Sequence, residues 1–307
     1  MSVRTAGVVG AGAFGRHHAR KYAQDGRVRL IGVYDPDAER AGMLAETHHV
    51  RAFDSLEALL AAAELITVAA PPLTHASIAR QALDAGVHVL VEKPLAVDLD
   101  AGADLVARAA ERQLTLACGH QERLVLEAMG LLDAPESPTL IESTRAGPWT
   151  GRSTDVSVAL DLMIHDIDLA LALLGEAPCE TYASGRRSHR ALCDAMVGRA
   201  RFPSGASARF FASRIADARS RTMRVVYPSG VVDVDFVARS FSNTTPFQLD
   251  PNFLEKPYAQ DPLGANVQRF IDAVLGEAPR PAVTGAEGLA ALGLAAQFEA
   301  KLVARAA

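Results

Sequence analysis

Cysteine is scarce in this chain of 307 residues, and its distribution argues against two classes of protein. The three cysteines, Cys118, Cys179 and Cys193, are odd in number and lack C-x-x-C spacing, so neither a disulfide framework nor a zinc site is expected. No run approaches the roughly 18 apolar residues of a membrane-spanning helix, and the amino terminus lacks the apolar core of a signal peptide. We therefore expect a cytoplasmic protein with no membrane partner.

An excess of positive charge is also missing. The chain has 31 Lys and Arg residues against 36 Asp and Glu residues, which gives a formal net charge of -5. This balance offers no basic surface for a nucleic-acid backbone, so we expect no nucleic-acid partner. With 49% hydrophobic and 22% charged residues, the composition is that of a globular protein. The length predicts about two domains.

Short apolar runs alternate with helical patterns up to residue 119. The runs lack polar alternation, which is typical of strands covered on both faces. Strands that alternate with helices predict βαβ units and a parallel sheet, so residues 1–119 are expected to form an α/β, doubly wound Rossmann domain. Its strands are expected at Thr5–Val9, Val28–Tyr34, Leu65–Ala69, Val87–Val91 and Leu114–Cys118, and its helices at Phe14–Gln24, Pro36–Glu46, Ser55–Ala63, Ser77–Ala85 and Asp98–Arg112.

Residues 120–307 have a different pattern and predict an α+β domain with an open, mostly antiparallel sheet. Short glycine-bearing turns at 203–205 and 228–230 are typical of hairpins. One helix is expected from Val158 to Leu174, ended by Gly175, and residues 243–262 are expected to be irregular. The strands are expected at Thr139–Arg145, Glu180–Arg186, Ala195–Phe202, Ala206–Ser213, Met223–Tyr227 and Val231–Val237, and two closing helices at Leu263–Leu275 and Ala286–Val303.

A glycine-rich turn follows the first predicted strand and opens a helix. The segment Gly10-Ala11-Gly12-Ala13-Phe14-Gly15 fits G-x-G-x-x-G, in which glycines allow a tight turn and a close approach to a pyrophosphate. Asp35 ends the second strand, about 20 residues later, where a carboxylate can bind the ribose hydroxyls of NAD. Asp35 could instead, or at the same time, cap the helix expected from Pro36. Arg40 lies nearby and could instead pair with the 2′-phosphate of NADP. We predict NAD as the cofactor, with NADP as the alternative.

Two opposite charges stand at the carboxyl end of the fourth predicted strand, in Glu92-Lys93-Pro94. Ligands bind at this edge of open α/β sheets. A lysine there could hydrogen-bond a substrate hydroxyl and assist proton movement. The alternative is a simple Glu–Lys pair at the end of a strand.

A histidine flanked by acids marks the helix of the second domain. Asp161 and His165 are four residues apart and Asp168 lies three further on, so an α-helix would present all three on one face. An acid one turn away can raise the basicity of an imidazole and hold its orientation. A metal site is the weaker alternative, because the sequence supplies no obvious further ligand.

Taken in order, these motifs resemble those of the glucose–fructose oxidoreductase, inositol dehydrogenase and rhizopine-catabolism (Gfo/Idh/MocA) family, over nearly the whole chain. The resemblance implies that Lys93, Asp161 and His165 form the catalytic set of an NAD(P)-dependent dehydrogenase that acts on CH–OH groups, and that Lys93, Asp161 and His165 also contact the substrate. The implied cofactor-binding residues are Gly10, Gly12, Ala13, Phe14, Gly15, Asp35, Arg40, Ala70, Pro71, Thr74, His75, Glu92, Lys93 and Gln121.

Finer motifs, such as Gly119-His120-x-Glu122-Arg123, look like the branch of the family that oxidises UDP-linked N-acetyl sugars at C3. Ser157-Val158 replaces the paired glycines that the family commonly has before its aspartate. Arg123, Arg145 and Arg152 are candidates to hold a substrate diphosphate, although solvated arginines are the alternative. Two other functions stay open: a free polyol or inositol dehydrogenase, and a non-catalytic NAD-binding regulator.

The antiparallel sheet also predicts an assembly. One face should pack against helices, and the other is expected to carry Val197, Phe210, Ala212 and Val226 or their alternates, since sequence does not fix the register. Such an apolar face favours association, and the resemblance implies the same. We expect a homodimer or homotetramer with two-fold symmetry through this sheet. The alternative is a monomer whose sheet is covered by residues 243–262.

Overall fold

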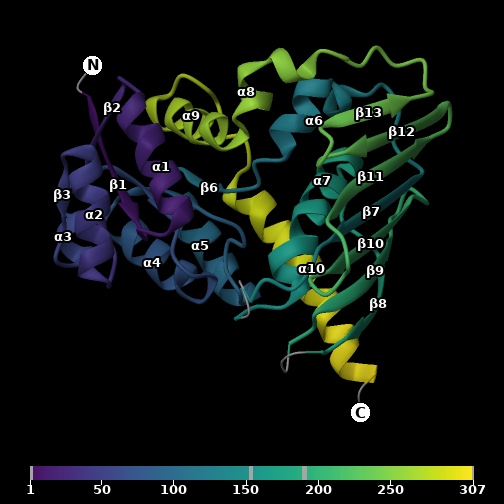
Figure 1. Cartoon of the computed structure of the whole chain (residues 1–307), viewed down its shortest axis with the longest axis horizontal. Helices are drawn as coiled ribbons and strands as arrows, with labels where there is room; N and C mark the ends of the chain where they lie inside the picture. Colours follow the sequence, from purple (N-terminus) through teal and green to yellow (C-terminus); the bar gives the residue numbers. More distant parts are fainter. Residues whose placement is uncertain (1–2, 152–154, 189–191, 306–307) are drawn as a thin grey trace. The chain divides into compact units, whose positions relative to one another are not determined.

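The computed structural model describes residues 3–151, 155–188 and 192–305 (Figure 1). The chain divides into two compact units. The first unit contains Met1–Gln121 and Asp261–Leu289, and the second contains Glu122–Gln260 and Ala290–Ala307. The expected boundary after residue 119 treats the rest of the chain as one domain. In the structure, a segment near the carboxyl end belongs instead to the first unit.

The first unit is built on a parallel sheet of six strands in the order β3-β2-β1-β4-β5-β6. This arrangement confirms the predicted α/β Rossmann fold. The two-residue strand β3 was not expected, because so short a run carries no pattern. The strands are β1 (Arg4–Val9), β2 (Val28–Tyr34), β3 (Arg51–Ala52), β4 (Leu65–Val68), β5 (His88–Val91) and β6 (Leu116–Cys118).

Side-chain caps begin several helices of the first unit. Asp37, Ser55 and Asp98 each accept a hydrogen bond from a backbone N–H in the first turn of the helix that follows. Helix α4 begins at Pro72, earlier than the expected Ser77, because proline is compatible with the first turn. The helices are α1 (Ala13–Gln24), α2 (Ala38–His48), α3 (Leu56–Leu60), α4 (Pro72–Asp84), α5 (Leu99–Glu111) and α9 (Pro262–Leu275), together with the start of α10 (Gly285–Arg305).

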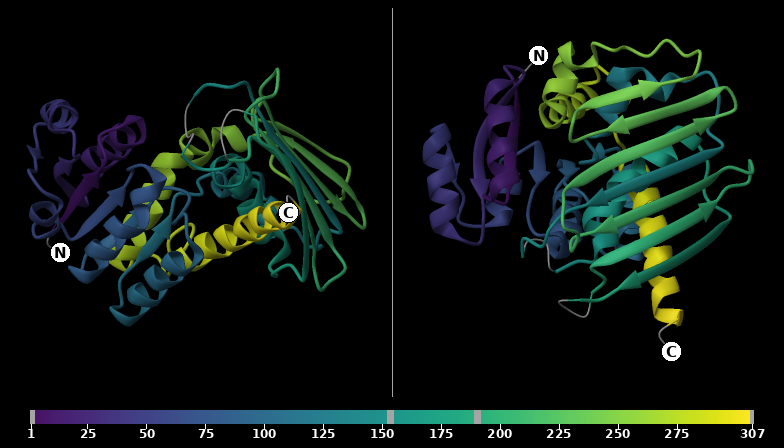
Figure 2. Two further views of the ribbon diagram at one scale, coloured as in Figure 1. Left: turned by 90° about the horizontal axis from the view of Figure 1, so that it is seen from below. Right: turned by 45° about the vertical axis from the view of Figure 1, so that its right-hand side comes forward.

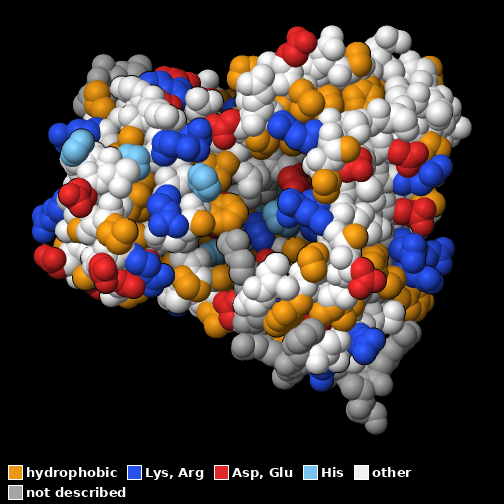
Figure 3. Space-filling view, in the orientation of Figure 1, with side chains coloured by type: hydrophobic (Ala, Val, Ile, Leu, Met, Phe, Trp, Pro, Cys, Tyr) orange, Lys and Arg blue, Asp and Glu red, His pale blue; other side chains and the backbone are white. Residues whose placement is uncertain are grey.

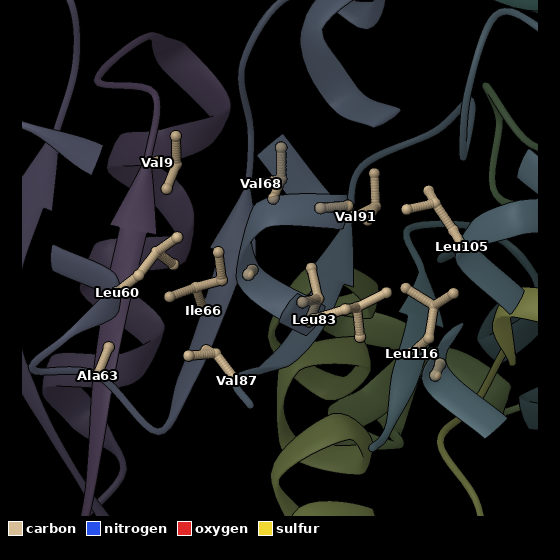
Figure 4. Packing of buried hydrophobic residues seen from close by; sticks show 14 of the residues in the cluster. Val9, Leu60, Ala63, Ile66, Val68, Leu83, Val87, Val91, Leu105 and Leu116 are labelled. Atoms are coloured by element: carbon tan, nitrogen blue, oxygen red, sulfur yellow. The ribbon is translucent and has the colours of Figure 1, made fainter. Parts of the chain in front are cut away.

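Apolar side chains cover both faces of this parallel sheet. Ile66 and Val68 of β4 belong to one buried cluster, drawn in Figure 4, whereas Leu65 belongs to a second cluster. Successive residues of a strand point to opposite faces, so the two clusters lie on the two sides of the sheet. The second cluster includes Phe270 and Ile271 of α9, which explains why this late segment belongs to the first unit.

The second unit is built on a sheet of seven strands in the order β13-β12-β11-β7-β10-β9-β8. Only β7 and β10 pair in parallel among its described strands, so the predicted mostly antiparallel sheet is confirmed. Strand β13 lies at the edge and begins just before the segment expected to be irregular. The strands are β7 (Leu140–Ala146), β8 (Glu180–Arg186), β9 (Ala195–Arg201), β10 (Ser207–Ser213), β11 (Ser220–Tyr227), β12 (Gly230–Asp235) and β13 (Ser240–Asn243).

Helices α7 (Ile164–Leu174) and α10 cover one face of the seven-stranded sheet, as the two views in Figure 2 show. Gly175 ends α7 with a φ of 69°, as the sequence predicts. The expected irregular segment contains a short helix, α8, of four residues. The remaining helical elements are α6 (Arg123–Met129), η1 (Leu131–Asp133), the π-helix η2 (Ala159–Met163), η3 (Phe253–Glu255) and α8 (Pro257–Gln260).

The other face of this sheet mixes charged and apolar side chains. Phe210 and Ala212 are fully buried on the helix-covered face, so it is their alternates, such as Phe211, that point to the open face. Arginines such as Arg224 and acids such as Glu142 and Asp233 share the open face with Val197 and Val226. Figure 3 shows charged side chains of both signs along the right-hand margin of the molecule. The open face is therefore less apolar than the sequence suggested.

Across the described residues, none of the helices combines the length and the hydropathy needed to cross a bilayer. The cytoplasmic location expected from the sequence stays a prediction.

Candidate active site

The glycine loop of the first unit has the geometry of a phosphate cradle. Gly10 has a φ of +98°, and a Cβ there would lie 2.5 Å from the carbonyl oxygen of Ala69, so only glycine fits. A Cβ on Gly15 would lie 1.8 Å from the carbonyl oxygen of Gly10, which shows how closely α1 packs on the loop. A Cβ on Gly12 would meet nothing within 4 Å. Gly12 is also the N-cap of α1, so open space adjoins the N–H groups of a helix start.

Asp35 is tied to this loop by its carboxylate. The N–H of Ala11 donates to Asp35 Oδ2 at 2.7 Å, and the N–H of Asp37 donates to Oδ1 at 2.9 Å. Arg40 lies 3.5 Å from Asp35 and donates to Asp37 at 2.8 Å. Two acids therefore share the charge of Arg40, and this balance favours an unphosphorylated ribose over a 2′-phosphate. The glycine loop and Asp35 together fit NAD.

Glu92 pairs with a histidine that the sequence did not single out. His18, on α1, is completely buried, and its Nε2 lies 2.8 Å from Glu92 Oε1. Burial alone would raise the pKa of Glu92, but the hydrogen bond from His18 and the charges of His18 and Lys93 hold this pKa below its usual value. The Lys93 N–H donates to Glu92 Oε2 at 3.3 Å. Glu92 thus links the end of β5 to the helix of the glycine loop.

His75 holds two loops at the carboxyl end of the parallel sheet. It is buried, and its ring nitrogens lie 2.7 Å from the carbonyl oxygen of Pro94 and 2.8 Å from that of Ala70. Burial lowers the pKa of His75, and a neutral imidazole has a single N–H for these two acceptors. Its contacts are those of a residue that positions the loops. Thr74, by contrast, is exposed and donates to the carbonyl of Pro71 at 2.8 Å.

The remaining predicted cofactor residues of the first unit are surface-accessible to different degrees. Ala13, Phe14 and Pro71 are exposed, whereas Ala70, Lys93 and Gln121 are half-buried.

In the second unit, Asp161 lies on a π-helical turn and His165 lies on the α-helix that follows it. The hydroxyl of Ser157 accepts a hydrogen bond from the N–H of Ala159 at 3.1 Å, and this cap stands where the family commonly has glycine. The i→i+5 bonding of η2 widens the turn, and such turns are frequent at functional sites. Asp161 and His165 are both half-buried. Asp168, expected on the same face, is instead buried.

A buried arginine joins two carboxylates beside this helix. Arg145 of β7 is 2% exposed; it donates to Glu122 Oε1 at 3.0 Å and Oε2 at 2.5 Å, and to Asp166 Oδ1 at 2.7 Å. Burial raises the pKa of Asp166, although Arg145 opposes this change. Glu122 Oε2 also lies 3.9 Å from His165 Nδ1. A negative charge is therefore held next to the imidazole.

Two of the three arginines expected to bind a diphosphate have carboxylate partners of their own. Arg123 donates to Asp168 through Nε at 2.8 Å and through Nη2 at 2.7 Å, in a buried fork. Arg145 is engaged as described above, and Arg152 lies outside the described residues. The sequence singles out Arg123 and Arg145 but does not indicate these partners, because the pairs Arg145–Asp166 and Arg123–Asp168 join residues that are far apart in the chain.

Arg221 of β11 was missed entirely by the sequence analysis. Its Nη1 lies 3.8 Å from Glu122 Oε1, and its side chain is 35% exposed. Burial, followed by the positive charge of Arg145, lowers the pKa of Arg221. The strand was expected only from Met223, whereas β11 begins at Ser220, and a single arginine outside any motif gives no sequence signal of this kind.

Comparisons with known proteins agree with the order of the motifs. Residues 4–120 match the model of an oxidoreductase family with an NAD-binding Rossmann fold, and residues 132–233 match the GFO/IDH/MocA C-terminal domain. The chain is 34% identical over 284 residues to UDP-N-acetylglucosamine 3-dehydrogenase of Acidithiobacillus ferrooxidans, covering 89% of each protein.

Solved structures share the fold over the whole chain. A structure of that Acidithiobacillus ferrooxidans enzyme has a TM-score of 0.90 at 33% identity and covers 99% of both chains. The WlbA dehydrogenase of Bordetella pertussis, solved with NADH and UDP-GlcNAcA, has a TM-score of 0.88 at 20% identity, covering 98% of this chain and 96% of its own. The second likeness concerns the fold alone.

Proposed function

The chain belongs to the glucose–fructose oxidoreductase, inositol dehydrogenase and rhizopine-catabolism family of NAD-binding oxidoreductases, and from this premise we propose that it oxidises a sugar nucleotide. The substrate loses a hydride from a secondary alcohol carbon, C3 of a UDP-N-acetylhexosamine. The observation that carries the proposal is the half-buried His165 with the Glu122 carboxylate 3.9 Å from its Nδ1. The identity of 34% over 89% of a UDP-N-acetylglucosamine 3-dehydrogenase supports the substrate.

NAD, when bound, accepts the hydride, and the glycine loop with Asp35 would hold it. The open space at Gly12 and the start of α1 would receive the pyrophosphate. Asp35 would accept hydrogen bonds from the ribose hydroxyls. Its carboxylate would accept them in addition to the hydrogen bond that it already accepts from the N–H of Ala11.

In the proposed reaction, His165 takes the proton of the substrate hydroxyl. The resulting imidazolium is stabilised by the negative charge of Glu122 and by Asp161, one turn earlier on the helix. Lys93 donates a hydrogen bond to the substrate oxygen and stabilises the charge that develops there. Each of these residues carries a group whose chemistry suits its role, and a pure NAD-binding regulator would need none of them.

The proposal is tested by the formation of NADH with UDP-N-acetylglucosamine as substrate. His165→Ala and Lys93→Met should each lower kcat by about 10²- to 10⁴-fold, because proton transfer and charge stabilisation are lost. His17→Ala is a matched control, since His17 is an exposed histidine on α1. Unchanged turnover in the first two variants would contradict the proposed roles.

A titration with UDP separates the sugar-nucleotide proposal from its alternatives. An enzyme of free polyols or inositol has no reason to bind UDP, whereas a sugar-nucleotide enzyme should bind it in the presence of NAD. Tight binding of sugars without any formation of NADH would favour a non-catalytic regulator.

We also propose that the chain assembles as a homodimer or homotetramer through the open face of the seven-stranded sheet. Arg209, Glu142, Arg224 and Asp233 are consecutive neighbours across four strands of this face and alternate in charge. Such a row can pair with a second, two-fold related copy of itself. Light scattering that gives only the 32.5 kDa mass of one chain would contradict this proposal.

A further inference from the structure

The second unit places several arginines at one end of its seven-stranded sheet. Arg145 lies near the end of β7, and Arg221 is its direct partner at the start of β11. Their side chains lie on the helix-covered face, as do those of the buried Met223 and Val225 further along β11. Arg219, which is exposed, immediately precedes the strand. Positive charge is therefore concentrated beside the helix that carries His165.

These arginines differ in how their charge is neutralised. Arg123 forms a buried fork with Asp168, and Arg145 is enclosed by Glu122 and Asp166. Arg214 donates to Asp194 at 2.8 Å and to the carbonyl of Val156 at 3.0 Å. All three are almost fully buried, so they hold the framework of the unit together.

Arg221 has a different environment. Its side chain is 35% exposed, and its contact with Glu122 is 3.8 Å, which is too long for a hydrogen bond. Glu122 already accepts two hydrogen bonds from Arg145, at 2.5 and 3.0 Å. Arg221 thus lies between a like charge, Arg145, and a carboxylate that is mostly committed elsewhere. An additional anion would complete its pairing.

Glu122 also fixes where that anion would lie. Its Oε2 lies 3.9 Å from His165 Nδ1, and its Oε1 lies 3.8 Å from Arg221 Nη1. A single carboxylate therefore connects the proposed proton acceptor with the accessible arginine. A sugar whose hydroxyl reaches His165 could present a charged substituent to Arg221.

We propose that Arg221 binds a phosphate group attached to the sugar and so determines that the substrate is a phosphorylated one. This inference rests on the proposed function for the position of the sugar. A guanidinium offers a planar pair of donors that matches two phosphate oxygens. An uncharged polyol would leave the half-buried Arg221 next to Arg145 with only its 3.8 Å contact to Glu122, which Arg145 already engages. The same chemistry is offered by a sugar phosphate and by the diphosphate of a sugar nucleotide.

Kinetics of Arg221→Met test the assignment. For the sugar nucleotide, KM should rise about 10- to 100-fold, as expected for the loss of charge-assisted hydrogen bonds, with kcat changed much less. Activity with the unphosphorylated N-acetyl sugar at high concentration should stay the same. In Arg221→Lys the increase in KM should be smaller than in Arg221→Met, because lysine restores the positive charge but not the planar pair of donors. Equal losses on charged and uncharged sugars would overturn the proposal.

Comparing a sugar nucleotide with the corresponding sugar 1-phosphate as substrates shows which phosphate Arg221 binds. A KM effect on both assigns Arg221 to the phosphate next to the sugar. An effect confined to the sugar nucleotide assigns it to the outer phosphate of the diphosphate. No effect on either overturns the proposal.

Binding of inorganic pyrophosphate, measured by calorimetry with NAD at saturation, distinguishes the inference from the proposed function. The wild type should bind pyrophosphate, and Arg221→Met should bind it at least about tenfold more weakly. Arg112→Met is the control, since Arg112 is 40% exposed and pairs with Asp84 on the other unit. Arg221-dependent binding without any sugar oxidation would leave the anion site standing and reject the dehydrogenase. Oxidation of unphosphorylated sugars with no pyrophosphate binding would support the dehydrogenase and reject the anion site at Arg221.

Discussion

The two units hold their functional groups by different physical means. In the first unit, the glycine loop works through the backbone: the φ of Gly10 and the absent side chain of Gly12 create the cradle, and few partners from elsewhere are needed. In the second unit, the groups around His165 are long side chains such as Arg145, which are positioned by carboxylates from distant parts of the chain. The first arrangement is encoded locally, and the second depends on tertiary packing.

Removing Arg145 should have the largest effect, and the effect should be confined to the second unit. Arg145→Met leaves Asp166 and Glu122 without their buried cation, at a cost of about 3–5 kcal/mol in the free energy of unfolding. Trp149, the only tryptophan, lies in the second unit, so its fluorescence reports the unfolding of that unit.

The pH dependence of this variant has a defined sign. Burial already raises the pKa of Asp166, and the loss of Arg145 removes an opposing charge. The folded form then holds a proton that the unfolded form releases above the ordinary pKa of about 4. The loss of stability should therefore be largest at neutral pH and shrink toward pH 4. A pH-independent loss, or a variant as stable as the wild type, would refute the role of the buried pair.

The first unit also contains a buried acid–histidine pair, Glu92 and His18, and His18→Leu tests whether this pair matters as much. The substitution leaves the buried Glu92 carboxylate without its 2.8 Å partner, which should destabilise the first unit by about 2–3 kcal/mol. His17→Leu is the matched control, because His17 is the exposed neighbour on the same helix. Thermal unfolding followed by circular dichroism, with and without NAD, gives the comparison. Equal effects of the two substitutions would show that the pair contributes nothing.

Backbone chemistry in the first unit is tested by Gly12→Ala. The new Cβ meets no protein atom within 4 Å, so the fold should be unaffected. The same Cβ would occupy the space that a pyrophosphate needs, and the affinity for NAD should fall roughly tenfold, or about 1.4 kcal/mol.

Gly42→Ala makes the same chemical change in α2, again with nothing within 4 Å. It should leave NAD binding intact and stabilise the helix by about 0.5–1 kcal/mol. Calorimetric titration of NAD into both variants measures the difference. Wild-type affinity in Gly12→Ala would place the pyrophosphate elsewhere.

The same contrast explains how much the sequence predicted. The Rossmann strands, the G-x-G-x-x-G turn and the cap at Gly175 depend on short segments, and the structure confirms the fold that they indicate. The carboxylate partners of Arg123 and Arg145 are 21 to 45 residues away in the chain, and no local sequence pattern predicts these pairs. Register was undecidable for the same reason, since Phe210 and Phe211 are equally apolar in sequence but face opposite sides of the sheet.

The smallest effect is expected from an arginine–aspartate pair that resembles Arg145–Asp166 in chemistry but not in burial. Arg224 lies 3.4 Å from Asp233 on the open face of the sheet, with both side chains about half exposed at 51% and 47%. Water and salt screen such a pair, so Arg224→Met should change the free energy of unfolding by at most about 1 kcal/mol. If the open face is the proposed interface, the loss should be larger at high protein concentration and shrink as the protein is diluted, because the unassembled chain no longer gains stability from the interface that Arg224 belongs to. Thermal unfolding monitored by Trp149 fluorescence at two protein concentrations measures the loss of stability and its dependence on concentration. Light scattering on the same samples reports the assembly. A loss close to that of Arg145→Met at every concentration would contradict the assignment of Arg224 to a solvated surface.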